Sequence, residues 1–210
     1  MRVLIFGASG RTGRELVRQG IAAGHEVTAF VRNPAAFTAA EHLRIATGDV
    51  HDLAAVNIAM IEQEAVLSAL GGTLSDEDLL PRSMENILAA MQRKNVRRLV
   101  VLGAAGATES ALKRMPAVPR TMFRVFMGTL LRKPFKSQRA MQQLVRASDT
   151  EWTIVQPPRL LNVPARGKIR VDADALPENG SRISRADLAA FMLAQLESTE
   201  WIRRQPCIAW

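Results

Sequence analysis

The chain has 210 residues, of which 48% are hydrophobic and 23% charged, with a formal net charge of +8. These values are ordinary for a soluble globular protein and fit a single domain with a full hydrophobic core. No apolar run approaches the ~20 residues that a membrane-spanning helix requires, which excludes stable membrane insertion. The single cysteine, Cys207, excludes an internal disulfide, and a first strand beginning near Met1 leaves no room for a secretory signal, so we expect a cytoplasmic protein.

The positive charge is concentrated in one segment. Residues 110–148 contain nine basic residues and no acidic residue, so the rest of the chain is close to neutral. Three interpretations are open. The segment could be a lid-like insertion over a substrate cleft, with Phe123 beneath it and arginines facing an anionic ligand. It could be a basic amphipathic helix touching a membrane or nucleic acid, or the solvated face of an ordinary helix. Because no aromatic platform for bases is evident, nucleic acid is not expected as the partner.

The first fourteen residues predict a dinucleotide-binding turn. The apolar run at residues 3–6 is typical of a strand buried on both faces, and a helical pattern begins directly after a glycine-rich turn. Gly7 permits a tight turn, Gly10 lets the backbone approach a pyrophosphate, and Gly13 lets the helix pack closely on the sheet. The helix would present its N–H groups and the positive end of its dipole to the phosphates. The expected cofactor contacts here are Gly7, Ser9, Gly10, Arg11, Thr12 and Gly13.

The tip of the second predicted strand, residues 26–31, favours NADP over NAD. In a dinucleotide fold this tip meets the adenosine ribose, where an acidic residue would accept hydrogen bonds from the 2′-hydroxyl. The sequence has Arg32 instead, and a guanidinium can grip a 2′-phosphate bidentately. We therefore expect NADPH as the cofactor.

Asp49 follows the third predicted strand, residues 43–46, and two roles are open for it. Its carboxylate could accept a hydrogen bond from the adenine amino group, or it could cap the helix that begins near Asp52. We include Asp49 and its neighbour Val50 among the expected cofactor contacts.

Three further strands are predicted at residues 65–70, 98–102 and 152–155, and the alternation of strands with helices indicates an α/β fold. We expect a doubly wound, mostly parallel sheet with helices on both faces, Rossmann-like, in a single domain over residues 1–210. The carboxyl ends of its strands gather at one edge, where ligands bind and where small residues suit the close approach of a flat nicotinamide. The expected contacts at this edge are Leu70, Gly71, Ala104, Ala105 and Pro157, with Arg159 just beyond them.

Three local signals concern the ends of elements. Ser75 precedes first-turn acids and predicts the cap of the helix before the fifth strand. Residues 168–171 predict a short additional strand. Ser184 and Asp187 form a capping box before the last predicted helix, residues 188–196.

Several chemistries are excluded by what the sequence lacks. It has no tyrosine, so the Tyr-x-x-x-Lys pair with which short-chain dehydrogenases reduce ketones cannot operate. Three scattered histidines and one cysteine give no metal-ligand spacing, and we expect no metal. Neither a Gly-x-Ser-x-Gly elbow nor a Walker lysine occurs. No catalytic residue is assigned from the sequence.

Motifs spread along the chain, as far as about Leu196, carry a family resemblance. They are residues 7–13, Val31 and Arg32, residues 48–50, Leu70 and Gly71, Asn86 and Ile87, Pro157 and Pro158, and Ser184 with Asp187 and Leu188. In these motifs the chain resembles the atypical short-chain dehydrogenase/reductase proteins of the flavin reductase (biliverdin reductase B) type, and more loosely the NmrA-like proteins. The resemblance implies NADPH bound by the glycine turn, Arg32 and Asp49, and hydride transfer to a flavin or another flat conjugated acceptor.

Two positions depart from the flavin reductase members, since Ala104 stands where they have a serine and Arg159 where they have a histidine. Flavin reduction needs neither, because hydride goes to the ring and water can supply the proton. Arg159, together with the basic segment and Phe123, instead indicates an acidic, aromatic small-molecule acceptor. The alternative is an NADP(H)-binding redox sensor of the NmrA-like kind, which binds cofactor without turnover and acts through a protein partner.

Overall fold

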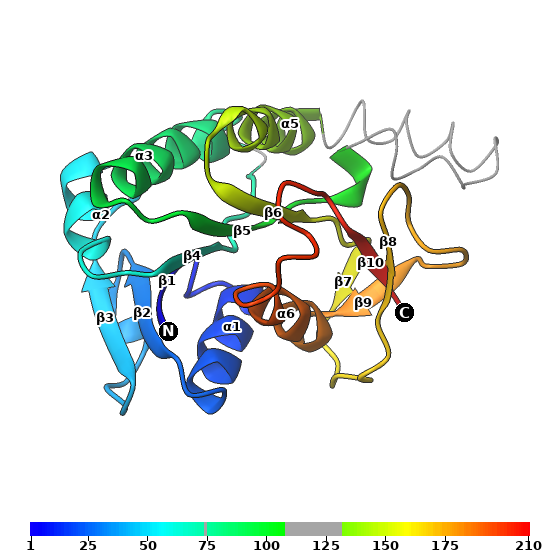
Figure 1. The fold of residues 1–210 in the computed structure, drawn as a ribbon, viewed down its shortest axis with the longest axis horizontal. Helices are drawn as coiled ribbons and strands as arrows, with labels where there is room; N and C mark the ends of the chain where they lie inside the picture. The colour runs from blue at the N-terminus through cyan, green and yellow to red at the C-terminus, as the bar shows by residue number, and fades with distance from the viewer. Residues whose placement is uncertain (74, 108–131) are drawn as a thin grey trace.

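The computed structural model describes residues 1–73, 75–107 and 132–210 (Figure 1). Its centre is a six-stranded parallel sheet with the strand order β3-β2-β1-β4-β5-β6. The strands are β1 (Arg2–Phe6), β2 (Glu26–Val31), β3 (Leu43–Thr47), β4 (Ala65–Ser68), β5 (Arg98–Leu102) and β6 (Glu151–Val155). The order reverses between β1 and β4, which is the switch point of a doubly wound sheet. The predicted Rossmann-like α/β fold is therefore confirmed.

Helices cover both faces of the sheet (Figure 1). On one face lie α1 (Arg11–Ala22) and α6 (Arg185–Ala194), and on the other lie α2 (Leu53–Ala59), α3 (Leu79–Lys94) and α5 (Arg132–Ala147). Strand β1 shows why both faces are covered. Val3 and Ile5 belong to the core beneath α1 and α6, whereas Leu4 and Phe6 belong to the core beneath the other three helices. A strand that is apolar at every position needs partners on both sides.

The C-terminal third adds two small sheets beside the main one. Strand β7 (Arg159–Leu161) pairs in parallel with β9 (Arg182–Ser184), and β8 (Arg170–Asp172) pairs antiparallel with β10 (Cys207–Ala209). The tail before β10 runs along the outer edge of β6, where the Ile154 N–H donates to the carbonyl oxygen of Arg204 at 3.1 Å. This pairing covers an edge that would otherwise be open.

The element ends confirm one local prediction and correct two. Ser184 caps α6, because its Oγ accepts from the Asp187 N–H at 2.9 Å and donates to the Asp187 carboxylate at 2.7 Å. The predicted Ser75 cap is wrong, since α3 begins four residues later behind Asp78. The short strand predicted at 168–171 is shifted to Arg170–Asp172, where pairing with β10 defines it.

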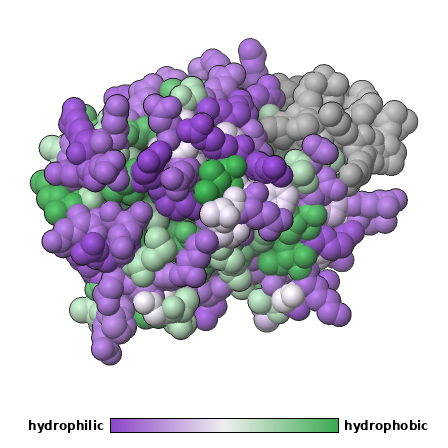
Figure 2. All heavy atoms as spheres, in the orientation of Figure 1, coloured by the Kyte–Doolittle hydropathy of each residue, from purple (hydrophilic) through white to green (hydrophobic). Residues whose placement is uncertain are grey.

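The described half of the basic segment forms an ordinary covering helix. In α5, Met141 and Val145 are buried in the core, while Arg132, Lys133, Lys136, Arg139 and Arg146 are exposed. The rest of the segment, including Phe123, lies outside the described residues. None of the helices in the described ranges combines the length and the hydropathy needed to cross a bilayer. On the face drawn in Figure 2, described apolar residues form small patches between polar ones.

Candidate functional site

The glycine turn between β1 and α1 leaves no space for side chains at two of its positions. Gly7 has φ +72°, and a Cβ there would lie 2.8 Å from the carbonyl group of Ala69 at the end of β4. A Cβ on Gly13 would lie 2.1 Å from the Gly7 carbonyl oxygen and 2.7 Å from Ala8 Cα. Both positions therefore require glycine. Gly7 has a positive φ, and at both Gly7 and Gly13 neighbouring backbone atoms lie too close for a Cβ.

The same turn presents unused hydrogen-bond donors. Gly10 is the N-cap of α1, and no side chain caps this helix within the described residues. The N–H groups of Arg11, Thr12 and Gly13 in the first turn have no intrahelical acceptor, and they coincide with the positive end of the helix dipole. Thr12 is buried, while Ser9 and Arg11 are exposed. Such an uncapped N-terminus is suited to binding an anionic group.

Two arginines lie near this turn: Arg14 in the first turn of α1, and Arg32 directly after the end of β2. Arg32 is exposed, and in the described part of the chain its side chain has neither a hydrogen bond nor an ion pair. Arg14 is fully engaged: its guanidinium donates to the carbonyl oxygens of Ser9 at 3.1 Å and Ala36 at 2.9 Å, and it lies over the Phe37 ring at 5.2 Å. Arg14 thus ties the glycine turn to the loop after β2, while Arg32 keeps its donors available. Sequence analysis missed Arg14, because its partners are distant backbone atoms.

The structure decides one of the two alternatives for Asp49. Its Oδ1 accepts from the His51 N–H at 2.8 Å, whereas the cap of α2 is Asp52, whose Oδ1 accepts from the Ala54 N–H at 2.9 Å. The helix-capping role considered for Asp49 is therefore wrong. The Asp49 carboxylate is exposed at the end of β3, and the carbonyl oxygen of neighbouring Val50 accepts from the Asn86 side chain at 2.9 Å.

The ends of β5 and β6 are joined by backbone hydrogen bonds. The Gly103 N–H donates to Val155 at 2.8 Å, and the Ala105 N–H donates to Pro157 at 3.0 Å. Ala105 is 1% exposed and packs near Cys207, so only Ala104 of the predicted alanine pair is accessible. Pro157 is also buried, and it contributes through its carbonyl group. Leu70 is partly buried and Gly71 exposed after β4.

A buried amide network supports this edge from behind. A Cβ on Gly103 would lie 2.8 Å from Oε1 of Gln156, so this glycine fits directly against the amide. The Gln156 side chain donates to Gln142 of α5 at 2.9 Å and to Gln205 of the tail at 3.1 Å. These hydrogen bonds hold the end of β6, helix α5 and the C-terminal tail together behind Ala104. Sequence spacing did not predict this network.

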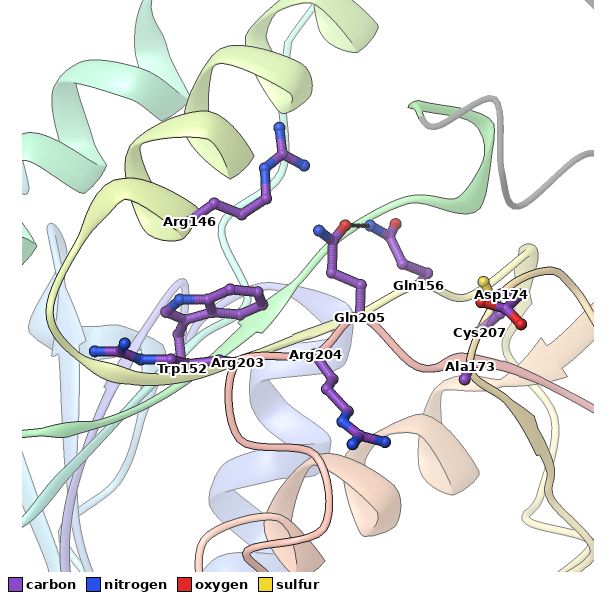
Figure 3. A pocket seen from close by; sticks show the side chains of 9 residues that line it. All are labelled: Arg146, Trp152, Gln156, Ala173, Asp174, Arg203, Arg204, Gln205 and Cys207. Atoms are coloured by element: carbon purple, nitrogen blue, oxygen red, sulfur yellow. Dashed lines mark hydrogen bonds between the residues drawn. The ribbon is translucent and has the colours of Figure 1, made fainter.

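The pocket in Figure 3, about 450 Å³ in volume, does not involve the predicted site residues. It lies along the outer edge of β6 and is lined by Arg146, Arg203 and Arg204 among others. Their guanidinium groups point away from one another, so they do not converge on a ligand (Figure 3). Within the described ranges, no three His, Cys, Asp or Glu side chains gather to hold a metal ion.

Fold and site together define a dinucleotide-binding protein. An uncapped helix follows a sterically required glycine turn, at the switch point of a doubly wound sheet. Over residues 7–199 the sequence matches the family described as NAD(P)H-binding, and the chain belongs to this family. The turn fits the diphosphate of such a cofactor, because its glycines carry no side chains that would block a close approach and no side chain among the described residues caps the first turn of α1.

Known relatives cover the whole chain. The uncharacterized protein YwnB of Bacillus subtilis is 29% identical over 211 residues, which is 95% of this chain and 94% of YwnB. A short-chain dehydrogenase/reductase from Veillonella parvula, solved in complex with NADP, superposes with a TM-score of 0.80 at 19% identity, covering 100% of this chain and 94% of that one. ChuY, an anaerobillin reductase from Escherichia coli O157:H7, gives a TM-score of 0.77 at 19% identity, with 100% and 97% covered. Both structural matches show the shared fold.

Proposed function

We propose that this protein is an NADPH-dependent oxidoreductase that transfers hydride to a flavin or a similar flat conjugated acceptor. The observation that carries the proposal is the arrangement at the carboxyl edge of the sheet. There the glycine turn, the exposed Arg32 and the accessible Ala104 lie at the ends of β1, β2 and β5. The Veillonella short-chain dehydrogenase/reductase in complex with NADP and the Escherichia coli anaerobillin reductase agree with a reductase on this fold.

The preference for NADPH rests on Arg32. Its guanidinium has no partner in the described ranges, so it can meet a 2′-phosphate without breaking an existing interaction. A charge-assisted hydrogen bond contributes ~1.5–3 kcal/mol, which corresponds to a preference of roughly tenfold to a hundredfold. Asp49, free of the α2 cap, remains available to accept from the adenine amino group.

The residues near Ala104 position ligands rather than transfer protons. When bound, the nicotinamide supplies hydride, and the protein has to hold two flat rings in contact and exclude competing groups. Ala104 adds only a methyl group to this surface, and the Gln156 network fixes the backbone beneath it. No tyrosine exists to donate a proton. The mechanism therefore suits acceptors whose proton comes from water, and flavins meet this requirement.

The second candidate function is an NADP(H)-binding redox sensor without turnover. It is favoured by the absence of a titratable side chain at Ala104 and by Arg159, which stands where the flavin reductase members have a histidine. A sensor would bind the cofactor in the same turn and signal through a protein partner.

Cofactor binding and turnover are tested separately. NADPH and NADH are titrated by nicotinamide fluorescence against wild type, Arg32→Ala and the control Arg44→Ala, an exposed arginine on β3. Arg32→Ala is expected to lose NADPH affinity selectively, and the control to match wild type. Equal wild-type affinities for the two cofactors would contradict the assignment of Arg32. NADPH oxidation is then followed anaerobically with flavins, bilins and quinones. If no acceptor causes NADPH oxidation while the protein still binds the cofactor, the result would favour the sensor.

A further inference from the structure

Strand pairing brings a second arginine to the position of Arg159. In the parallel pair of β7 and β9, Arg159 is opposite Arg182, and Leu160 is opposite Ile183. Neighbouring strands lie about 4.8 Å apart, and paired residues project from the same face. Leu160 and Ile183 pack into the core beneath α1 and α6, so the alternation places both arginines on the opposite face, where they are exposed.

This arginine pair has no compensating charge bound to it among the residues that the structure describes. Neither guanidinium has a hydrogen bond or an ion pair in the described ranges, although like charges directly opposite one another destabilise a strand pair. Other arginines nearby are engaged. Arg185 donates to Asn162 Oδ1 at 2.6 Å, Arg166 lies over the Trp210 ring at 3.8 Å, and Arg170 donates to the carbonyl oxygen of Glu178 at 2.6 Å. Packing and hydrogen bonding therefore explain these three arginines but not the pair.

Strand β7 runs beside the candidate cofactor site. Two residues before β7, the carbonyl oxygen of Pro157 accepts from the Ala105 N–H, next to Ala104. In the middle of β7, the carbonyl oxygen of Leu160 accepts from the Arg185 side chain at 3.3 Å. Arg185 is the first residue of α6, which packs against α1, and burial and then the charge of Arg11 lower the pKa of Arg185. Arg159 follows Pro157 by two residues, so the start of β7 lies near a ligand whose ring would rest at Ala104.

We infer that Arg159 and Arg182 form a seat for two negative charges on the acceptor. This inference rests on the proposed function and narrows its substrate class. The acceptor is a flat conjugated molecule whose side arm ends in a phosphate monoester or in two neighbouring carboxylates. Two planar guanidinium groups side by side can bind either group through several charge-assisted hydrogen bonds. Binding also removes the repulsion between the two arginines.

Matched acceptors test the seat and identify its ligand group. Flavin mononucleotide is compared with riboflavin, which lacks the phosphate, and biliverdin with its dimethyl ester, which lacks the carboxylate charges. For each pair, kcat/KM is measured in wild type, Arg159→Gln, Arg182→Gln and the control Arg44→Gln. We expect the wild type to prefer the charged member of at least one pair, by about tenfold to a hundredfold. Either glutamine variant at the seat should reduce that preference about tenfold, mainly through KM, and Arg44→Gln should keep it.

Two measurements without turnover separate this inference from the proposed function. Binding of flavin mononucleotide in the presence of NADP⁺ is followed by flavin fluorescence, and thermal unfolding is recorded for each variant. Weaker flavin binding in Arg182→Gln with an unchanged or higher Tm supports the seat, even if no acceptor is reduced. If kcat/KM is equal for the charged and uncharged members of both acceptor pairs, the inference of a seat is wrong, while the proposed reductase function is unaffected. A lower Tm in the seat variants with an unchanged acceptor preference also overturns it, because the arginines are then structural.

Discussion

The substitution Gly13→Ala tests whether the glycine turn is as closely packed as the structure indicates. The new Cβ would lie 2.1 Å from the Gly7 carbonyl oxygen and 2.7 Å from Ala8 Cα. These are backbone atoms that no rotamer change can move, so the turn and α1 must separate by roughly 1 Å to restore ordinary contact. Alanine inside a helix gains ~1 kcal/mol over glycine, whereas overpacking of this kind costs about 1–3 kcal/mol and sometimes more.

Because the clash involves several backbone atoms at once, we take the upper part of that range. The expected net loss is about 2 kcal/mol, which lowers the Tm of a chain of this size by about 4–8 °C. Gly10→Ala is the matched variant, since its Cβ would lie 3.2 Å from Gly7 O and its φ of −69° suits any residue. As a poorer N-cap, it should cost less than about 1 kcal/mol.

The two variants should separate stability from cofactor affinity. Thermal unfolding and NADPH titration are measured for both. Gly13→Ala should lose stability and affinity together, while Gly10→Ala should keep most of its stability and bind NADPH at least about tenfold more weakly, because its methyl group occupies the approach of the diphosphate. An unchanged Tm in Gly13→Ala would refute the packing argument. Unchanged NADPH affinity in Gly10→Ala would place the phosphates elsewhere.

Three further predictions follow from buried or engaged side chains. Arg98→Met should lower the free energy of unfolding by about 2–4 kcal/mol in urea, because the buried guanidinium donates to Gln195 O at 2.8 Å and Thr153 Oγ1 at 2.9 Å and its loss orphans these acceptors. Burial raises the pKa of Asp187, but hydrogen bonds from four donors outweigh it, so the folded-state pKa is lowered. A lowered pKa gives stability that is present at neutral pH and is lost as pH falls from about 4 towards the folded-state pKa. Asp187→Asn should therefore have a lower free energy of unfolding at pH 7, and this free energy should change less than that of wild type as the solution is acidified. Arg14→Ala should weaken NADPH and NADH alike, in contrast to Arg32→Ala, since it only ties the glycine turn to Ala36; a selective loss of NADPH would contradict this.

Local patterns were sufficient to predict the fold and to assign the candidate site residues to one edge of the sheet. The run at residues 3–6 and the spacing of Gly7, Gly10 and Gly13 carry their meaning in backbone conformation and close approach, which neighbouring residues largely set. Once six such strands alternate with helices, right-handed parallel crossovers bring their carboxyl ends to one edge. This is why residues as distant as Gly7 and Ala104 could be assigned to the same side of the molecule.

The sequence by itself thus determined the parallel sheet, the common edge of its strand ends and the glycine turn. Only the tertiary structure decided which side chains are free to act there. Arg32 and Arg14 look alike in sequence, yet distant carbonyl groups engage only Arg14. Likewise, Asp52 rather than Asp49 caps α2, and Arg182 joins Arg159 across 23 positions of chain. Pairing and hydrogen bonding between remote segments depend on how the whole chain packs, and no local pattern contains that information.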